Sequence, residues 1–149
     1  MFQHLLVICT GNICRSPVAA AMLRAALPDR DIASAGLGAL VGQGVEPTAR
    51  ELAEADGLDV GAHRARQVTP AMLSRAELIL VMSEGQRRAV GELAPAALGK
   101  TLLLGRWLDG GSLEGQGMEI PDPYRQSRDA FEQTHRLLKA ATAAWADRL

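Results

Sequence analysis

Two side chains that could do chemistry on a phosphate group lie near the start of this sequence, the thiol of Cys9 and the guanidinium of Arg15. A thiolate is a nucleophile, and a guanidinium holds two phosphate oxygens at once and stabilises the charge of a phosphoryl-transfer transition state. The pair therefore predicts attack by Cys9 on phosphorus and a cysteinyl-phosphate intermediate. The predicted phosphate-binding loop consists of Cys9, Thr10, Gly11, Asn12, Ile13, Cys14 and Arg15.

The elements around this loop are predicted to be a strand before it and a helix after it. An apolar run covers residues 5–8, and an Ala- and Leu-rich stretch covers residues 18–27. Ser is favoured at an N-cap and Pro at the first helical position, so Ser16 predicts a cap and Pro17 the helix start. Unpaired N–H groups and the helix dipole would attract a phosphate and favour the thiolate of Cys9. The loop of residues 9–15 does not contain the Gly-Lys-Ser/Thr signature of a nucleotide-binding loop.

A second candidate group, the carboxyl of Asp122, stands between two prolines and is followed by Tyr124. Proline restricts the backbone, so this acid is held on a stiff segment. A protonated carboxyl beside the phosphate site could give its proton to the leaving oxygen, and the carboxylate could then activate water. We therefore predict Asp122 as general acid and general base.

Composition predicts one globular domain over residues 1–149. The chain is 48% hydrophobic and carries a formal net charge of −1, which argues against nucleic acid as a main partner. No apolar run is long enough for a membrane span, and no signal peptide is evident at the start, so we expect no membrane insertion and a cytoplasmic location.

The two cysteines and three histidines lack metal-ligand spacing, so neither a metal nor another cofactor is predicted. Cys9 and Cys14 lie five residues apart, close enough for a transient disulfide if the loop brings the sulfurs together. In the alternative interpretation, Cys14 only packs behind the loop.

Alternating strands and helices predict an α/β fold, an open four-stranded parallel sheet with helices on both faces. Ligands of such sheets bind at the carboxyl ends of strands, where the strand order reverses. A Gly-rich loop covers residues 36–44, with Leu40 or Val41 expected at a cleft, and residues 105–119 form an irregular connection of unassigned role. Strands are predicted at 5–8, 31–35, 77–82 and 101–104, and helices at 17–27, 47–55, 70–75 and 84–93 and from a cap at Ser127 or Asp129 to residue 146.

The pattern of Cys9, five residues, Arg15 and Ser16 resembles the low-molecular-weight protein tyrosine phosphatases over most of the chain. The resemblance implies that Asp122 is the proton donor and that Tyr124 lines the cleft. It also implies that His63 orients Asn12, and that Leu40 stands at the cleft where eukaryotic members tend to carry an aromatic residue. Arg125 stands where many eukaryotic members have a second Tyr.

Residues 34–42 and 122–125 look most like bacterial members encoded with capsule or exopolysaccharide export systems. This resemblance implies that the substrate is the phosphotyrosine cluster of a partner tyrosine autokinase. One alternative is an arsenate reductase of the same fold, but such enzymes need further cysteines. The other alternative is a phosphate- or phosphotyrosine-binding module without turnover, which would be expected to lack the Cys, the Arg or the Asp, whereas Cys9, Arg15 and Asp122 are all present.

Overall fold

The computed structural model describes residues 2–108 and 117–149, and within them the chain forms a parallel sheet. The strand order is β2-β1-β3-β4, and every paired neighbour is parallel. This confirms the predicted α/β fold; β2 runs one residue further than expected, and β3 and β4 are shorter. The strands are β1 (His4–Cys9), β2 (Asp31–Gly36), β3 (Leu78–Val81) and β4 (Thr101–Leu103).

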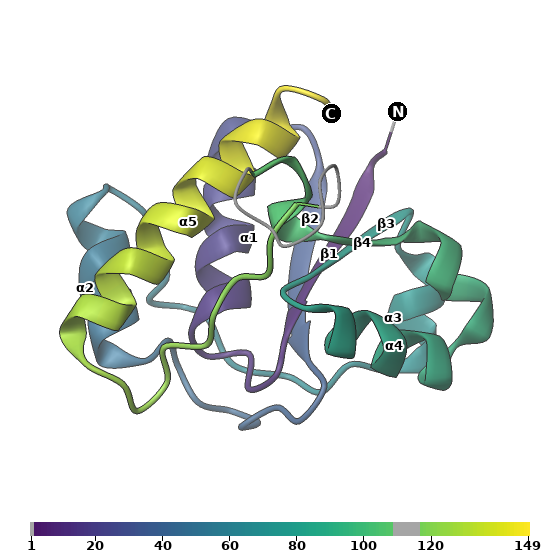
Figure 1. Ribbon diagram of the computed structural model, residues 1–149, viewed down its shortest axis with the longest axis horizontal. Helices are drawn as coiled ribbons and strands as arrows, with labels where there is room; N and C mark the ends of the chain where they lie inside the picture. The colour runs from purple at the N-terminus through teal and green to yellow at the C-terminus, as the bar shows by residue number, and fades with distance from the viewer. Residues whose placement is uncertain (1, 109–116) are drawn as a thin grey trace.

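Helices cover both faces of the sheet, as predicted (Figure 1). On one face lie α1 (Arg15–Ala26), α2 (Pro47–Ala55) and α5 (Arg128–Ala146), and on the other α3 (Pro70–Arg75) and α4 (Glu84–Leu93). The caps are local: the side chains of Thr69, Ser83 and Ser127 each accept a hydrogen bond from an N–H of the helix that follows. Two short 3₁₀ helices, η1 (Pro95–Lys100) and η2 (Leu104–Trp107), flank β4.

Strand β1 divides the core between the two faces. Leu5 and Val7 belong to the cluster packed under α1 and α5, and Leu6 and Ile8 belong to the cluster on the α3 and α4 side. All four side chains are buried, as expected for a central strand with helices on both faces. Cys9 continues the alternation on the α1 side, so its sulfur lies where the strand meets the helix.

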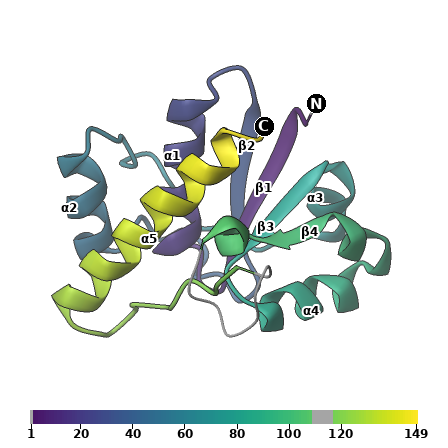
Figure 2. The same cartoon turned by 45° about the horizontal axis from the view of Figure 1, so that its top comes forward.

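The loop after β1 lies where the strand order reverses, because β1 has β2 on one side and β3 on the other. Both chain termini lie at the opposite end of the molecule (Figures 1 and 2). The structure therefore puts Cys9 at the carboxyl-end crevice, the general ligand position in open α/β sheets.

Helix α1 begins at Arg15, two residues before the predicted start at Pro17. The residue at the N-cap is Cys14, and no side chain caps the helix there, so the prediction that Ser16 is the cap was wrong. The Ser16 hydroxyl instead lies 2.9 Å from the sulfur of Cys9. A Ser cap would occupy one of the N–H groups at the helix start, and the uncapped start leaves these groups for another acceptor.

None of the helices in the described ranges has the length and apolar character needed to cross a bilayer.

Candidate active site

The backbone of the loop after β1 is turned so that its carbonyls point outward. The carbonyls of Cys9, Thr10, Gly11 and Ile13 accept hydrogen bonds from the N–H groups of Leu37, Gly38, Leu40 and Glu46, at 2.8–3.1 Å. The Asn12 carbonyl accepts from the ring Nε2 of His63 at 2.7 Å. In a trans peptide the C=O and the following N–H point in opposite directions, so the amide hydrogens of residues 10–14 face the inside of the loop. The loop is thus a ring of donors suited to one tetrahedral anion.

Asn12 holds this loop from within. It is fully buried and has a φ of 59°, a left-handed conformation that Asn tolerates better than most residues. Its Nδ2 donates to the hydroxyls of Ser16 at 2.8 Å and Ser34 at 3.0 Å, and its Oδ1 accepts from the N–H of Arg66 at 2.9 Å. The backbone N–H of Arg66 can only donate, so it fixes which end of the amide is oxygen.

The Ser16 hydroxyl connects Asn12 to Cys9. Because the Ser16 oxygen accepts from Asn12 Nδ2, its own hydroxyl proton is free to be donated to the sulfur of Cys9, 2.9 Å away. The Cys9 sulfur is then the acceptor of this bond. Cys9 is 2% exposed and lines the cleft above the loop.

Arg15 is almost completely buried, yet part of its guanidinium is unused. Nη1 donates to the Ile120 carbonyl at 2.7 Å, and Nη2 lies 3.7 Å from Oδ2 of Asp122. Within the described part of the chain, Nε is buried without a hydrogen-bond partner. A buried N–H normally has an acceptor, so the free Nε and Nη2 edge fits a bound oxyanion with two adjacent oxygens.

The segment that carries Asp122 is anchored close to Arg15. The N–H of Ile120 donates to the Met82 carbonyl at the end of β3, while its carbonyl accepts from Arg15. Asp122 Oδ1 accepts from the N–H of Tyr124 at 3.1 Å, which fixes the orientation of the carboxyl group. Asp122, the predicted acid, is 107 residues after Arg15 in the sequence and lies beside the phosphate loop in the structure.

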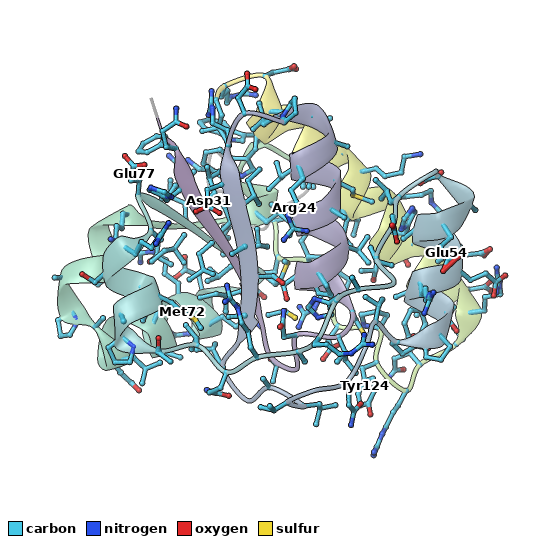
Figure 3. All side chains as sticks on the ribbon, turned by 180° about the vertical axis from the view of Figure 1, so that it is seen from behind. Arg24, Asp31, Glu54, Met72, Glu77 and Tyr124 are labelled. Carbon is cyan, nitrogen blue, oxygen red and sulfur yellow. The ribbon has the colours of Figure 1, made fainter. Side chains whose placement is uncertain are left out.

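A cleft of about 160 Å³ brings these groups together. Leu40 and Tyr124 form part of its walls, as the resemblance implied, and Figure 3 shows Tyr124 at the end of the molecule opposite Asp31 and Glu77. Val41, the alternative to Leu40, is 70% exposed and is not part of the lining. The lining residues are Cys9, Thr10, Gly11, Ile13, Cys14, Arg15, Gly38, Leu40, Asp122 and Tyr124.

Two residues near the loop were not found by sequence reasoning. Gln86 is buried in the first turns of α4, accepts from the N–H of Met82 at 2.8 Å and donates to the Thr10 hydroxyl at 3.2 Å. Gly36 ends β2 so close to the loop that a Cβ there would lie 2.5 Å from the Thr10 carbonyl. Each is an ordinary residue in the sequence, and only its distant partner gives it a role.

His63 and Cys14 have pKa values shifted by their surroundings. Burial lowers the pKa of His63, against the opposing effect of its bond to the Asn12 carbonyl, and nearby arginines lower it further. The bond requires a proton on Nε2, and the lowered pKa favours the neutral ring that carries its proton there. Burial raises the pKa of Cys14 to about 12, with Cys9 and nearby carboxylates adding to the effect. Neither cysteine is in a disulfide, and Cys14 belongs to the buried core cluster as well as to the cleft lining.

His135 is bonded to Asp56 at 2.6 Å and is not part of the cleft lining. In the described ranges, no group of three or more His, Cys, Asp or Glu side chains is gathered as a metal site. Residues 109–116 of the irregular connection lie outside the described ranges.

Fold and site together define a class of protein in which a cysteine and an arginine share one phosphate loop. The sequence matches the family "Low molecular weight phosphotyrosine protein phosphatase" over residues 4–149. The chain belongs to this family and is an enzyme of the protein-tyrosine-phosphatase class.

Individual relatives agree with this assignment over at least 95% of their length. The chain is 43% identical to the low molecular weight protein-tyrosine-phosphatase Wzb of Salmonella typhimurium, covering 100% of this chain and 95% of that protein. Wzb from Escherichia coli K30 in complex with sulphate is 44% identical, with a TM-score of 0.92 and 99% of each chain covered. Vibrio vulnificus Wzb in complex with benzylphosphonate is 42% identical, with a TM-score of 0.91 and 100% of each chain covered.

Proposed function

We propose that this protein hydrolyses phosphotyrosine in two steps through a phosphate ester on Cys9. The observation that carries the proposal is the cleft itself: a buried sulfur, five inward amide hydrogens, a buried Arg15 Nε without a partner, and the Asp122 carboxyl beside Arg15. The co-structure of Vibrio vulnificus Wzb with benzylphosphonate, an aryl-bearing phosphate analogue, supports the same kind of ligand here.

In the first step, the thiolate of Cys9 attacks phosphorus, the S–P bond forms and the P–O bond to the tyrosine ring breaks. Asp122 gives its proton to the departing phenol oxygen. In the second step, Asp122 takes a proton from water, the water oxygen bonds to phosphorus and the S–P bond breaks, which releases inorganic phosphate and returns the thiolate. Arg15 and the loop amides stabilise the negative oxygens in both transition states.

Selection of tyrosine follows from the position of Cys9 at the base of the cleft. Leu40 and Tyr124 wall the entrance, so a substrate must extend past them before its phosphate meets the loop. A phosphotyrosine side chain has the length and the flat apolar ring for this path, and a phosphoserine side chain is too short.

Hydrolysis of p-nitrophenyl phosphate tests the chemistry. We expect Cys9→Ser to abolish turnover and Asp122→Asn to lower kcat by about 100-fold or more, since general acid catalysis contributes at least that much. Asp29→Asn removes the same charge from an exposed turn before β2 and serves as the matched control. A non-catalytic binding module would show no turnover in the parent protein, and equal rates for parent and Cys9→Ser would refute the assigned nucleophile.

We propose further that the protein works in the cytoplasm on a bacterial tyrosine autokinase that controls exopolysaccharide or capsule export. This proposal rests on the likeness of residues 34–42 and 122–125 to export-associated members of the family. Trapping with Cys9→Ser or Asp122→Ala in lysate of the source bacterium is expected to capture a tyrosine-phosphorylated kinase. Capture of other phosphoproteins in its place would remove this assignment and leave the chemistry intact.

An arsenate reductase function is not favoured, because the family match is to phosphatases and the sequence has only two cysteines.

A further inference from the structure

Arg125 stands in a backbone conformation that disfavours its residue type. Its φ is 63°, and Asn12 is the other non-glycine residue with a positive φ in the described ranges. The N–H of Gln126 donates to the Pro123 carbonyl at 2.8 Å, so residues 123–126 form a turn with Arg125 at the third position. A turn with positive φ at that position favours Gly or Asn. An Arg held there at a cost of about 1–2 kcal/mol indicates a use for its side chain.

The guanidinium of Arg125 lies over a wall of the cleft. Its Cζ is 5.3 Å from the centre of the Tyr124 ring, and Tyr124 lines the cleft that leads to Cys9. Arg125 is exposed, and in the described part of the chain it has no hydrogen-bonded or ion-paired partner. A guanidinium stacked on an aromatic face keeps its N–H donors free at the edge, so Arg125 is held in place and is still able to bind an anion.

The opposite flank of the entrance has the other charge. A second hollow of about 420 Å³ shares Thr10, Arg15 and Asp122 with the cleft and is also lined by Glu119. Glu119, whose carboxylate accepts from the backbone N–H of Glu84 at 2.8 Å, and Asp122 put two carboxylates on this flank. An anionic group next to the substrate phosphotyrosine would therefore be repelled from the side that carries Glu119 and attracted to Arg125.

From this geometry, and resting on the proposed phosphatase function, we infer that Arg125 selects substrates that carry an anionic group beside the phosphotyrosine. Two kinds of side chain could supply this negative charge, a carboxylate and a second phosphorylated residue. Arg pairs with either, and a phosphate has more charge and three oxygens for the fork. Arg125 is thus a specificity-determining residue outside the phosphate loop.

The test compares kcat/KM for three phosphotyrosine peptides of one length, with neutral, Glu or phosphoserine flanking residues. For the parent protein we expect kcat/KM of the Glu peptide to be about three times that of the neutral peptide, and kcat/KM of the phosphoserine peptide to be about ten times that of the neutral peptide. The Arg125→Asn variant suits the turn and lacks the charge, so its ratios should fall towards one. Arg125→Lys should restore most of the preference, and added salt should weaken it in the parent.

Arg75→Gln is the matched control, because Arg75 is an exposed arginine that pairs with Asp31 at the other end of the sheet (Figure 3). It should keep the parental ratios. A parent that hydrolyses all three peptides equally well, or an Arg125→Asn variant that keeps the preference, overturns the inference and leaves the proposed function standing. Absence of hydrolysis of the neutral peptide by the parent would instead refute the proposed function, and this inference with it.

Discussion

Removal of the Asn12 side chain should collapse the phosphate loop, and the size of the effect can be worked from its bonds. The side chain makes three hydrogen bonds, to Ser16, Ser34 and the N–H of Arg66, of which the first two are buried and the third is partly buried. At about 1 kcal/mol for each bond, Asn12→Gly should lower the free energy of unfolding by about 3 kcal/mol. Asn12→Ala should cost about 1 kcal/mol more, because φ at this position is 59° and Ala has a Cβ.

Ser34→Ala provides the graded comparison, since it deletes one of the three bonds and should cost about 1 kcal/mol. Urea unfolding followed by circular dichroism measures all three variants, and hydrolysis of an aryl phosphate measures the loop. Activity should fall in the same order as stability, because the amide ring and the Ser16 bond to Cys9 both depend on Asn12. An Asn12→Gly variant that loses no more stability than Ser34→Ala would refute the network as the support of the loop.

Three further outcomes are expected. Gln86→Ala removes the bonds to the Met82 N–H and to the Thr10 hydroxyl, so it should lower both kcat and the free energy of unfolding. Gln86→Glu keeps an acceptor for the Met82 N–H and loses the donor to Thr10, so it should lower kcat in the same assay while keeping more of the stability. The pKa of His63 is lowered from 6.5, so the contribution of its neutral ring to stability is present above pH 6.5 and is lost as pH falls towards the folded-state pKa. The difference in free energy of unfolding between the parent and His63→Gln should therefore narrow on acidification. A difference that does not change with pH would contradict the assigned burial. With a pKa of about 12, Cys14 stays a thiol at neutral pH, so iodoacetamide followed by peptide mass spectrometry should leave it unmodified in the folded protein and label it after unfolding.

The sequence by itself determined the local parts of this protein. The Cys9 to Arg15 spacing, the apolar runs of β1 and β3 and the caps at Thr69 and Ser83 were all readable, because each depends on side chains within one turn or one strand. The combination of a thiol, an arginine and a proline-flanked acid was also enough to predict the class of chemistry.

Tertiary structure decided how the loop is held and where the helix starts. Asn12 bonds to groups 22 and 54 residues away, and Arg15 bonds to the carbonyl of a residue 105 positions along the chain. The preference of Ser16 for a cap lost to its bonds with Asn12 and Cys9, and Asn12 is in turn held by Ser34 and Arg66, which only the fold brings within reach. Capping is worth about 1 kcal/mol and acts on neighbours, while a buried network satisfies several groups at once, so the network determines the site.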